Sequence, residues 1–365
     1  MPAIQPPATI LVTGVSGFAG TWVARALLEA GYSVRGTVRS DAKVKYLQEL
    51  FKEHAEKFAT VVVPDIAKQG AYDTAIDENI EGVVHVAGVT DFTNDPPPSG
   101  TVRRLFRHVS RWFVTPATSK VLGPNTEGVK WLLESLHKNA PNMKRLVYIS
   151  SAQALLGKEL GHIYTEDDWN NQAVTELKEK RDDVDGQALF AASKVLAERT
   201  IIEFIQKHEE DVHWDATRLV PTWLYGPIIH ECQTLDELNF SSKLFYRFCT
   251  AKREPDKVNQ YCSDFIDVRD LADACVAALG TEEAGGERFV LGAGAFTYQN
   301  LYDAIRSAWP DAPGVPIGNK EAEKVSFPHP FVNSDKARKV LKLKEFRTLS
   351  ECGVDALKSF RERGF

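Results

Sequence analysis

The residues of this chain whose types and spacing suit chemistry form two sets: three glycines near the start, and a Ser, Phe and Lys set near the middle. The glycines recur every third residue in TGVSGFAG, residues 13–20. In such a turn the first glycine permits a tight bend, the second lets the main chain approach a pyrophosphate, and the third allows close helix packing. Free N–H groups at the start of the following helix then face the anion. The candidate anion-binding residues are Gly14, Ser16, Gly17, Phe18 and Gly20.

The elements around this turn have the required order. Residues 8–12 are a short apolar run typical of a strand, and residues 21–32 carry apolar side chains at helical spacing. Strand, glycine turn and helix together are the context in which this motif binds a dinucleotide. A glycine pattern alone is a weak signal, because glycine-rich turns join many strands and helices.

The next predicted strand, residues 32–40, indicates which dinucleotide is bound. It ends with Arg39, and Lys43 follows shortly. An acidic residue at this point usually binds the ribose hydroxyls of NAD, whereas a basic residue suits the 2′-phosphate of NADP. Arg39 therefore favours NADP(H), with Lys43 as a second cation, although both residues could also be ordinary surface cations.

Two further predicted strands, residues 59–63 and 82–87, end in segments that would line the same crevice, because the carboxyl ends of parallel strands meet at the cofactor. We expect the first segment to flank the adenine, and the second to lie beside the central phosphates and ribose. The residues concerned are Asp65 and Ile66 in the first segment and Val86, Ala87 and Gly88 in the second.

The chain resembles the extended short-chain dehydrogenase/reductases of the NAD-dependent epimerase/dehydratase superfamily. Within them it is similar to the branch of dihydroflavonol reductases and fungal aldehyde/ketone reductases. The resemblance runs from Thr9 to about Phe360 and rests on TGVSGFAG, TVRS, PDI, LVYISSA, AASK, RLVPTWLYGP and DFIDVRDLADA. It implies an α/β fold, a Rossmann-type doubly wound parallel sheet with a smaller C-terminal α/β substrate lobe. The expected boundaries are 8–225 for the NADP-binding domain and 226–365 for the lobe, with 263–292 returning to the core.

The resemblance also implies an activity, the transfer of a hydride from NADPH to a ketone or aldehyde of a small organic molecule, such as a secondary metabolite. Ser151 would hydrogen-bond the carbonyl oxygen, Lys194 would hold the nicotinamide ribose, and Pro221 would lie near the nicotinamide. The family's proton donor is a Tyr four residues before this Lys, but the chain has Phe190 there. A general acid is typically worth about 10²–10⁴-fold in rate, so its loss should impair turnover without preventing cofactor binding.

Three interpretations of Phe190 remain open. It could be a substitution that traps a substrate complex in an ordinary reductase. Another donor could replace the tyrosine, with Tyr164, His162 and water as the nearest candidates in sequence. The loop YTEDDWN, however, is more typical of a surface tyrosine that packs its ring and exposes its hydroxyl. Finally, the fold could serve a non-redox isomerase or cyclase, or act as an NADP-binding sensor without turnover.

A basic insertion at about 97–120 is longer than the family's connection at this point. Apolar residues recur at helical spacing between Val102 and Phe113, with four arginines on the opposite arc. The pattern predicts an amphipathic helix of about three turns, which could be a pocket lid, a partner or membrane-surface helix, or a sequence artefact.

Composition narrows the remaining choices. With 365 residues, 43% of them hydrophobic, the chain can bury a sizeable core, and its net charge of −6 argues against general nucleic-acid binding. Five scattered cysteines, the absence of an apolar span and an N-terminus unlike a signal peptide favour reduced thiols in the cytoplasm. We expect no metal, because no His/Cys group has zinc spacing, and a monomer or homodimer.

Overall fold

A seven-stranded, fully parallel sheet forms the centre of the molecule, with strand order β3-β2-β1-β4-β5-β6-β9. The computed structural model describes residues 3–90, 121–157, 159, 161–180, 184–319, 321 and 332–365, so the predicted insertion at 97–120 lies outside the described residues. The order reverses between β1 and β4, and such a switch point opens a crevice beyond the carboxyl ends of the strands. The strands are β1 (Thr9–Thr13), β2 (Ser33–Val38), β3 (Phe58–Val62), β4 (Ile80–His85), β5 (Arg145–Ile149), β6 (Asp215–Pro221) and β9 (Arg288–Leu291).

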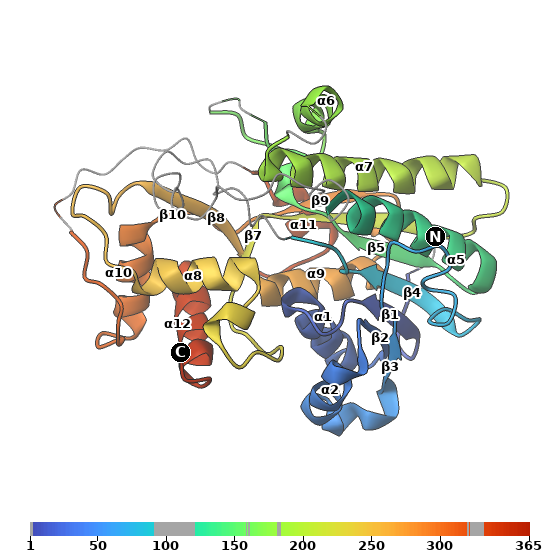
Figure 1. Cartoon of the computed structure of the whole chain (residues 1–365), viewed down its shortest axis with the longest axis horizontal. Helices are drawn as coiled ribbons and strands as arrows, with labels where there is room; N and C mark the ends of the chain where they lie inside the picture. Colours follow the sequence, from blue (N-terminus) through green and yellow to red (C-terminus); the bar gives the residue numbers. More distant parts are fainter. Residues whose placement is uncertain are drawn as a thin grey trace.

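Helices cover both faces of this sheet (Figure 1). One face packs against α1 (Phe18–Glu29), α2 (Val44–Leu50), α9 (Val268–Gly280) and α11 (Asp335–Val340), and the other against α5 (Gly128–Asn139) and α7 (Gly186–Lys207). Because helices cover both faces, the central strands are largely buried, and all five residues of β5 are buried, whereas the edge strand β3 is only partly buried. The short helix α6 (Asn171–Lys180) packs on the outside of α7.

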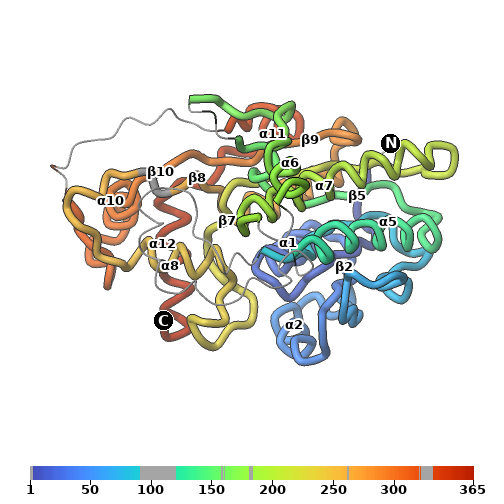
Figure 2. The backbone as a smooth tube through the Cα atoms, turned by 45° about the horizontal axis from the view of Figure 1, so that its top comes forward, coloured from blue at the N-terminus to red at the C-terminus, as the bar shows by residue number. Residues whose placement is uncertain are grey.

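A smaller lobe is built around a three-stranded sheet of order β10-β8-β7. Its strands are β7 (Trp223–Tyr225), β8 (Tyr261–Asp267) and β10 (Gly294–Thr297), and its helices are α8 (Phe240–Thr250), α10 (Tyr298–Ala308) and α12 (Leu349–Arg361). Thr297 and Thr348 form capping boxes at the starts of α10 and α12, which satisfy the N–H groups that a helix start leaves unpaired. Figure 2 shows this lobe beside the main sheet, with α8, α10 and α12 gathered at one end of the molecule.

The predicted doubly wound sheet with a smaller C-terminal lobe is confirmed. Within the stretch 263–292 that was expected to return to the core, α9 and β9 do lie with the large sheet, whereas residues 263–267 belong to β8 of the small sheet. No helix of the described residues is long and apolar enough to cross a membrane.

Candidate functional site

The glycine-rich stretch forms the turn between β1 and α1, as predicted. Gly14 has φ +68°, in the left-handed region that favours glycine. A Cβ at Gly20 would collide with the carbonyl oxygen of Gly14, so the helix packs directly on the turn. Gly17 precedes α1 and no side chain caps the helix. The first N–H groups of α1 therefore remain available to an anion, which the positive end of the helix dipole also favours.

The carboxyl ends of β1 and β4 are joined by one hydroxyl. Thr13 Oγ1 accepts hydrogen bonds from the N–H groups of Val86 (3.1 Å) and Ala87 (3.0 Å) and lies 2.8 Å from Nδ1 of His85. Because both lone pairs of the hydroxyl are taken, its proton goes to His85, whose Nδ1 must then be unprotonated. Burial lowers the pKa of His85 to about 3, with the nearby charge of Lys194 as a smaller cause. His85 is thus a neutral core histidine that fixes the turn at Val86 and Ala87.

The expected adenosine-phosphate end lies at the carboxyl end of β2. Arg39 is exposed there, and among the described residues no hydrogen bond or ion pair engages its side chain. Lys43 is partly exposed and forms an ion pair of 2.8 Å with Glu231, from the loop that follows β7. The positions of Arg39 and Lys43 are consistent with a 2′-phosphate site, but the charge of Lys43 is paired with the Glu231 carboxylate.

Lys194 reaches the carboxyl end of β5 from α7. Its Nζ donates a hydrogen bond to the carbonyl oxygen of Ile149 (3.1 Å) and lies 5.3 Å above the ring centre of Tyr148. Burial lowers the pKa of Lys194 to about 8, and the carboxylate of Glu198 opposes this shift. Ser151, two residues after Ile149, is partly exposed and accepts a hydrogen bond from the N–H of Gln153.

The Lys194 ammonium is also close to the turn after β4. A Cβ built on Gly88 would lie 3.9 Å from Nζ. The ends of β4 and β5 and helix α7 therefore meet beside the glycine turn, at the switch point where this fold binds its ligands.

Phe190 lies one helical turn before Lys194, with its ring centre 5.7 Å from Nζ. It is 5% exposed and packs in an apolar cluster with Val121 and Leu189. A phenyl ring in this cluster offers no proton, so any catalysis at the site needs a proton from another group.

The two side-chain alternatives for that proton, Tyr164 and His162, are not part of the Phe190 cluster. Tyr164 packs against Ala152, Val220 and Val290, in a cluster that does not include Phe190. The expectation that its hydroxyl would be exposed is wrong, because Tyr164 is 6% exposed and its hydroxyl is buried with no hydrogen-bond partner among the described residues. The imidazole of His162 lies 2.9 Å from the Asp168 carboxylate.

A buried ion pair next to the site was not anticipated from the sequence. Glu198 is fully buried one turn after Lys194, and its carboxylate accepts hydrogen bonds from Ser150 Oγ (2.5 Å) and Arg288 Nη2 (3.0 Å). Arg288 Nε completes the pair at 2.8 Å. The pair therefore ties α7 to Ser150, the residue before Ser151, and to β9. Only the i, i+4 spacing from Lys194 hinted at it.

Asn125 was likewise missed. It lies in a single π-helical turn, Gly123–Glu127, just before α5. Its side chain exchanges two hydrogen bonds with the backbone of Val89 (2.8 and 3.1 Å) and donates a third to Ser193 Oγ (3.0 Å). This buried amide joins the segment after β4 to the helix position next to Lys194, and π-turns of this kind are frequent at functional sites.

The other predicted positions lie along the same edge of the sheet. Asp65 is exposed and accepts a hydrogen bond from the N–H of Ala67, and Ile66 lies over the start of α5. Pro221 is the last residue of β6. The hydroxyl of Thr222, the residue after it, is buried with no partner among the described residues.

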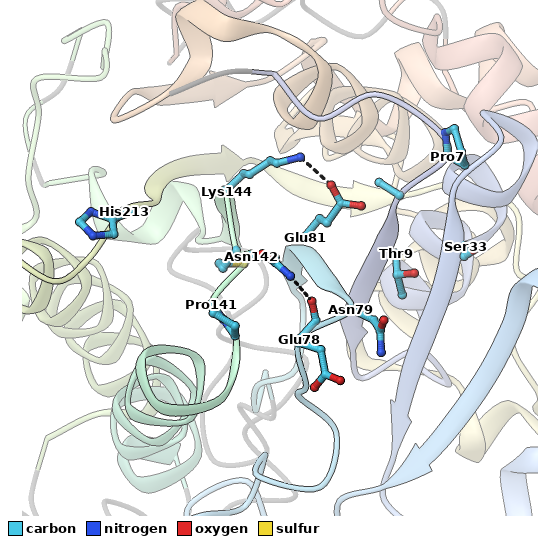
Figure 3. A pocket seen from close by; sticks show the side chains of 12 residues that line it. Pro7, Thr9, Ser33, Glu78, Asn79, Glu81, Pro141, Asn142, Lys144 and His213 are labelled. Carbon is cyan, nitrogen blue, oxygen red and sulfur yellow. Dashed lines mark hydrogen bonds and ion pairs between the residues drawn. The ribbon is translucent and has the colours of Figure 1, made fainter.

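A cavity of about 680 Å³ opens at the opposite, amino-terminal edge of the sheet (Figure 3). Its lining includes Thr9 and Ser33 at strand starts, and Lys144, which pairs with Glu81 at 2.6 Å. None of the predicted site residues lines this cavity, so it is distinct from the cofactor crevice.

Comparisons with known proteins agree with the geometry. The NAD dependent epimerase/dehydratase family matches residues 106–292, and GDP-mannose 4,6 dehydratase matches residues 11–93. An uncharacterized oxidoreductase of Schizosaccharomyces pombe is 31% identical over 97% of each chain. The ketoreductase azaE of Aspergillus niger is 31% identical over 97% of this chain and 98% of its own.

Among solved structures, yeast methylglyoxal/isovaleraldehyde reductase Gre2 complexed with NADPH superposes with a TM-score of 0.77. It is 25% identical and covers 97% of this chain and 99% of its own. The fold, the glycine turn and the similarity over nearly the whole length all confirm the family resemblance found in the sequence. The chain belongs to the NAD-dependent epimerase/dehydratase family, the extended short-chain dehydrogenase/reductases.

Proposed function

We propose that this chain is an NADPH-dependent carbonyl reductase that acts on a ketone or aldehyde of a small organic molecule. The observation that carries the proposal is the meeting of Lys194, the end of β5 with Ser151, and the glycine turn at one switch point. The named relatives include a ketoreductase and an aldehyde reductase solved with NADPH, which supports the same chemistry here.

The chain's own residues fit this cofactor. The uncapped start of α1 offers N–H groups to the pyrophosphate, and the exposed Arg39 offers a forked cation to the 2′-phosphate. Lys43 adds a second positive charge nearby, and Lys194 holds the nicotinamide ribose. When bound, NADPH supplies the hydride that reduces the carbonyl carbon.

The remaining steps depend on three side chains. Ser151 donates a hydrogen bond to the carbonyl oxygen, and the Lys194 ammonium stabilises the negative charge that develops there. Phe190 has no hydroxyl, the Tyr164 hydroxyl is buried outside the Phe190 cluster, and His162 is engaged with Asp168, so we assign the proton to water. The consequence is a slow reductase that binds its cofactor normally.

The test is NADPH oxidation, followed at about 340 nm over a panel of ketones and aldehydes, together with chromatographic detection of the alcohol product. Wild type is compared with Phe190→Tyr. Phe204→Tyr, the same change on the same helix but far from Lys194, is the matched control. We expect Phe190→Tyr to raise kcat/KM on the order of 10²-fold and the control to leave it unchanged.

Other outcomes distinguish the alternatives. High wild-type activity that tyrosine does not improve would assign the proton to another donor. Substrate conversion without NADPH oxidation would instead favour an isomerase or cyclase. Cofactor binding without conversion in either variant would favour a sensor.

A further inference from the structure

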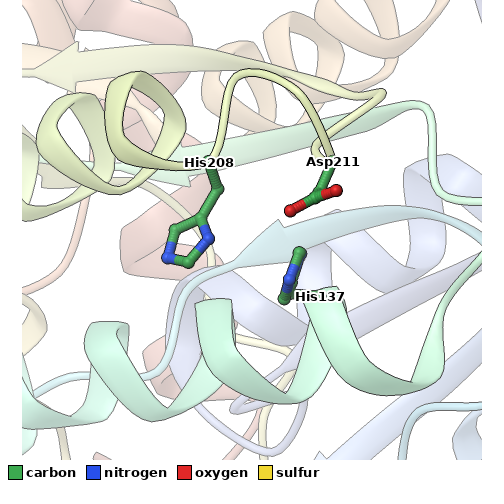
Figure 4. A group of neighbouring side chains, drawn as sticks. All are labelled: His137, His208 and Asp211. Carbon is green, nitrogen blue, oxygen red and sulfur yellow. The ribbon is translucent and has the colours of Figure 1, made fainter.

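We propose that His137, His208 and Asp211 form a binding site for a divalent transition-metal ion, with Zn²⁺ as the expected occupant. Their side-chain donor atoms all lie within 4.8 Å of one another. Figure 4 shows the two imidazoles and the carboxylate converging from two helices and a turn. His208 and Asp211 are three residues apart, but His137 lies about 70 residues earlier in the chain, so zinc-type spacing of His and Cys did not reveal the group.

The donor set suits this class of ion. Imidazole nitrogen and carboxylate oxygen bind Zn²⁺ at about 2.0–2.2 Å, and two His with one acidic residue leave a fourth position for water. Donor atoms around one tetrahedral ion lie roughly 3.5 Å apart, so the side chains must close by about an ångström from their present positions. His137 and Asp211 are exposed and His208 is half-buried, so rotation of the side chains can supply this movement.

Two helix ends and one carboxylate contribute negative charge to the cluster. His137 lies in the last turn of α5, and His208 is the residue that ends α7. Two helix C-termini therefore converge on the cluster, each with a partial negative charge. Asp211 adds a full negative charge.

The positions of the ligands are already restrained. The N–H groups of Asp211 (3.0 Å) and Val212 (2.7 Å) both bond to the carbonyl oxygen of His208, which fixes the turn. Phe204 packs against both imidazoles, with ring centres 6.0 Å from His137 and 4.6 Å from His208. Among the described residues, no hydrogen bond or ion pair occupies the ring nitrogens of either histidine.

A bound ion would connect the C-terminal ends of α5 and α7. Lys194 lies roughly 20 Å back along the axis of α7, at 1.5 Å per residue. The ion would therefore stabilise the helical layer without entering the reaction, and this inference does not depend on the proposed activity.

The test is calorimetric titration of chelator-treated protein with ZnCl₂. A parallel titration with CoCl₂ is followed by the visible absorption of a coordinated cobalt ion. We expect one ion per chain, with affinity reduced at least tenfold in His137→Ala and in His208→Asn. His213→Ala is the matched control, because His213 is exposed two residues after Asp211 but is not one of the three ligands. It should bind as wild type does.

Thermal unfolding gives a second measurement. An ion that binds only the folded chain raises the melting temperature, so Zn²⁺ should stabilise wild type and His213→Ala but neither ligand variant. The proposal is overturned if wild type binds no ion, or if the ligand variants bind as wild type does. The two imidazoles would then be only an aromatic contact with Phe204.

Discussion

The ammonium group of Lys194 is buried beside the ring of Phe190, which has no hydroxyl to donate a proton. Burial lowers its pKa to about 8, from an ordinary value near 10.5, so the group is charged at neutral pH but close to its titration. The Glu198 carboxylate, one turn away, keeps the pKa from falling further. Because position 190 has no hydroxyl, we expect the Lys194 ammonium to stabilise the negative charge that develops on the carbonyl oxygen.

Activity should consequently depend on the charge of Lys194. Protonated lysine predominates below about pH 8 and the neutral amine above it, so we predict that kcat/KM for carbonyl reduction falls as pH rises through about 8. The measurement is a pH profile of NADPH oxidation for wild type and for Lys194→Met. The variant should have low residual activity and no inflection there; an unchanged inflection would assign the titration to another group.

The sequence anticipated Ser151, Phe190 and Lys194, because each lies in a motif that is local in the chain. It did not anticipate the contacts that hold them. Ser150 directly follows β5, Glu198 lies in α7 and Arg288 begins β9, so their contact depends on the order of strands in the sheet. Apolar periodicity predicts strands and helices, but it does not predict which polar side chains face each other across the core.

At the scale of elements, helix α7 connects the residues of the site. It carries Phe190, Ser193, Lys194 and Glu198. Glu198 forms a buried ion pair with Arg288. Removing one partner of a buried pair leaves an uncompensated charge. The pair is therefore a point at which a single change affects both stability and the position of β5.

We predict that Glu198→Gln destabilises the protein by about 3–5 kcal/mol, because Arg288 would remain buried without a countercharge. Urea unfolding followed by circular dichroism measures this change. Glu203→Gln, an exposed position on the same helix, should lie within about 0.5 kcal/mol of wild type. Similar stability of the two variants would mean that the pair contributes little.

The loop after β7 is a second element with a direct effect on the site. It brings Glu231 to Lys43, and its backbone accepts hydrogen bonds from Trp22 at Pro227 and from Tyr46 at Ile229. This loop therefore fastens the smaller lobe to the helices beside the expected 2′-phosphate site. The Glu231 carboxylate repels a phosphate and competes with it for Lys43.

Glu231→Gln should therefore increase the preference for NADPH over NADH severalfold, in keeping with the roughly 0.2–1 kcal/mol of a partly exposed ion pair. The measurement is the ratio of dissociation constants for the two cofactors, obtained by fluorescence titration. Glu49→Gln removes the same charge from an exposed pair with Lys52 and serves as the control. An equal change in both variants would reflect net charge alone.

At the scale of the whole molecule, the doubly wound parallel sheet with a smaller C-terminal lobe follows from the family resemblance and was predicted correctly, whereas the order of its strands was not predicted. The contacts that fasten the helices to the large sheet were not predictable, because they depend on single long-range side chains. Arg145 is one example: fully buried at the start of β5, it donates hydrogen bonds to Asp215, to the carbonyl oxygen of Ala278 in α9 and to that of Thr281 just after α9. Such contacts connect the large sheet to the chain that returns from the smaller lobe.

Because the loop after β7 joins the smaller lobe to α1 and α2, cofactor binding should stabilise the whole chain as one unit. A ligand at about 100 times its dissociation constant adds about 2.7 kcal/mol to the stability of the folded state. We predict one calorimetric transition that moves to higher temperature with NADPH, and less with NADH at the same concentration. Arg39→Ala should reduce the NADPH shift to that of NADH while leaving the transition of the free protein unchanged, since Arg39 is exposed and no described side chain contacts its charge. Two transitions, only one of which responds to cofactor, would mean that the loop after β7 does not couple the lobes and that 2′-phosphate recognition is confined to the large sheet.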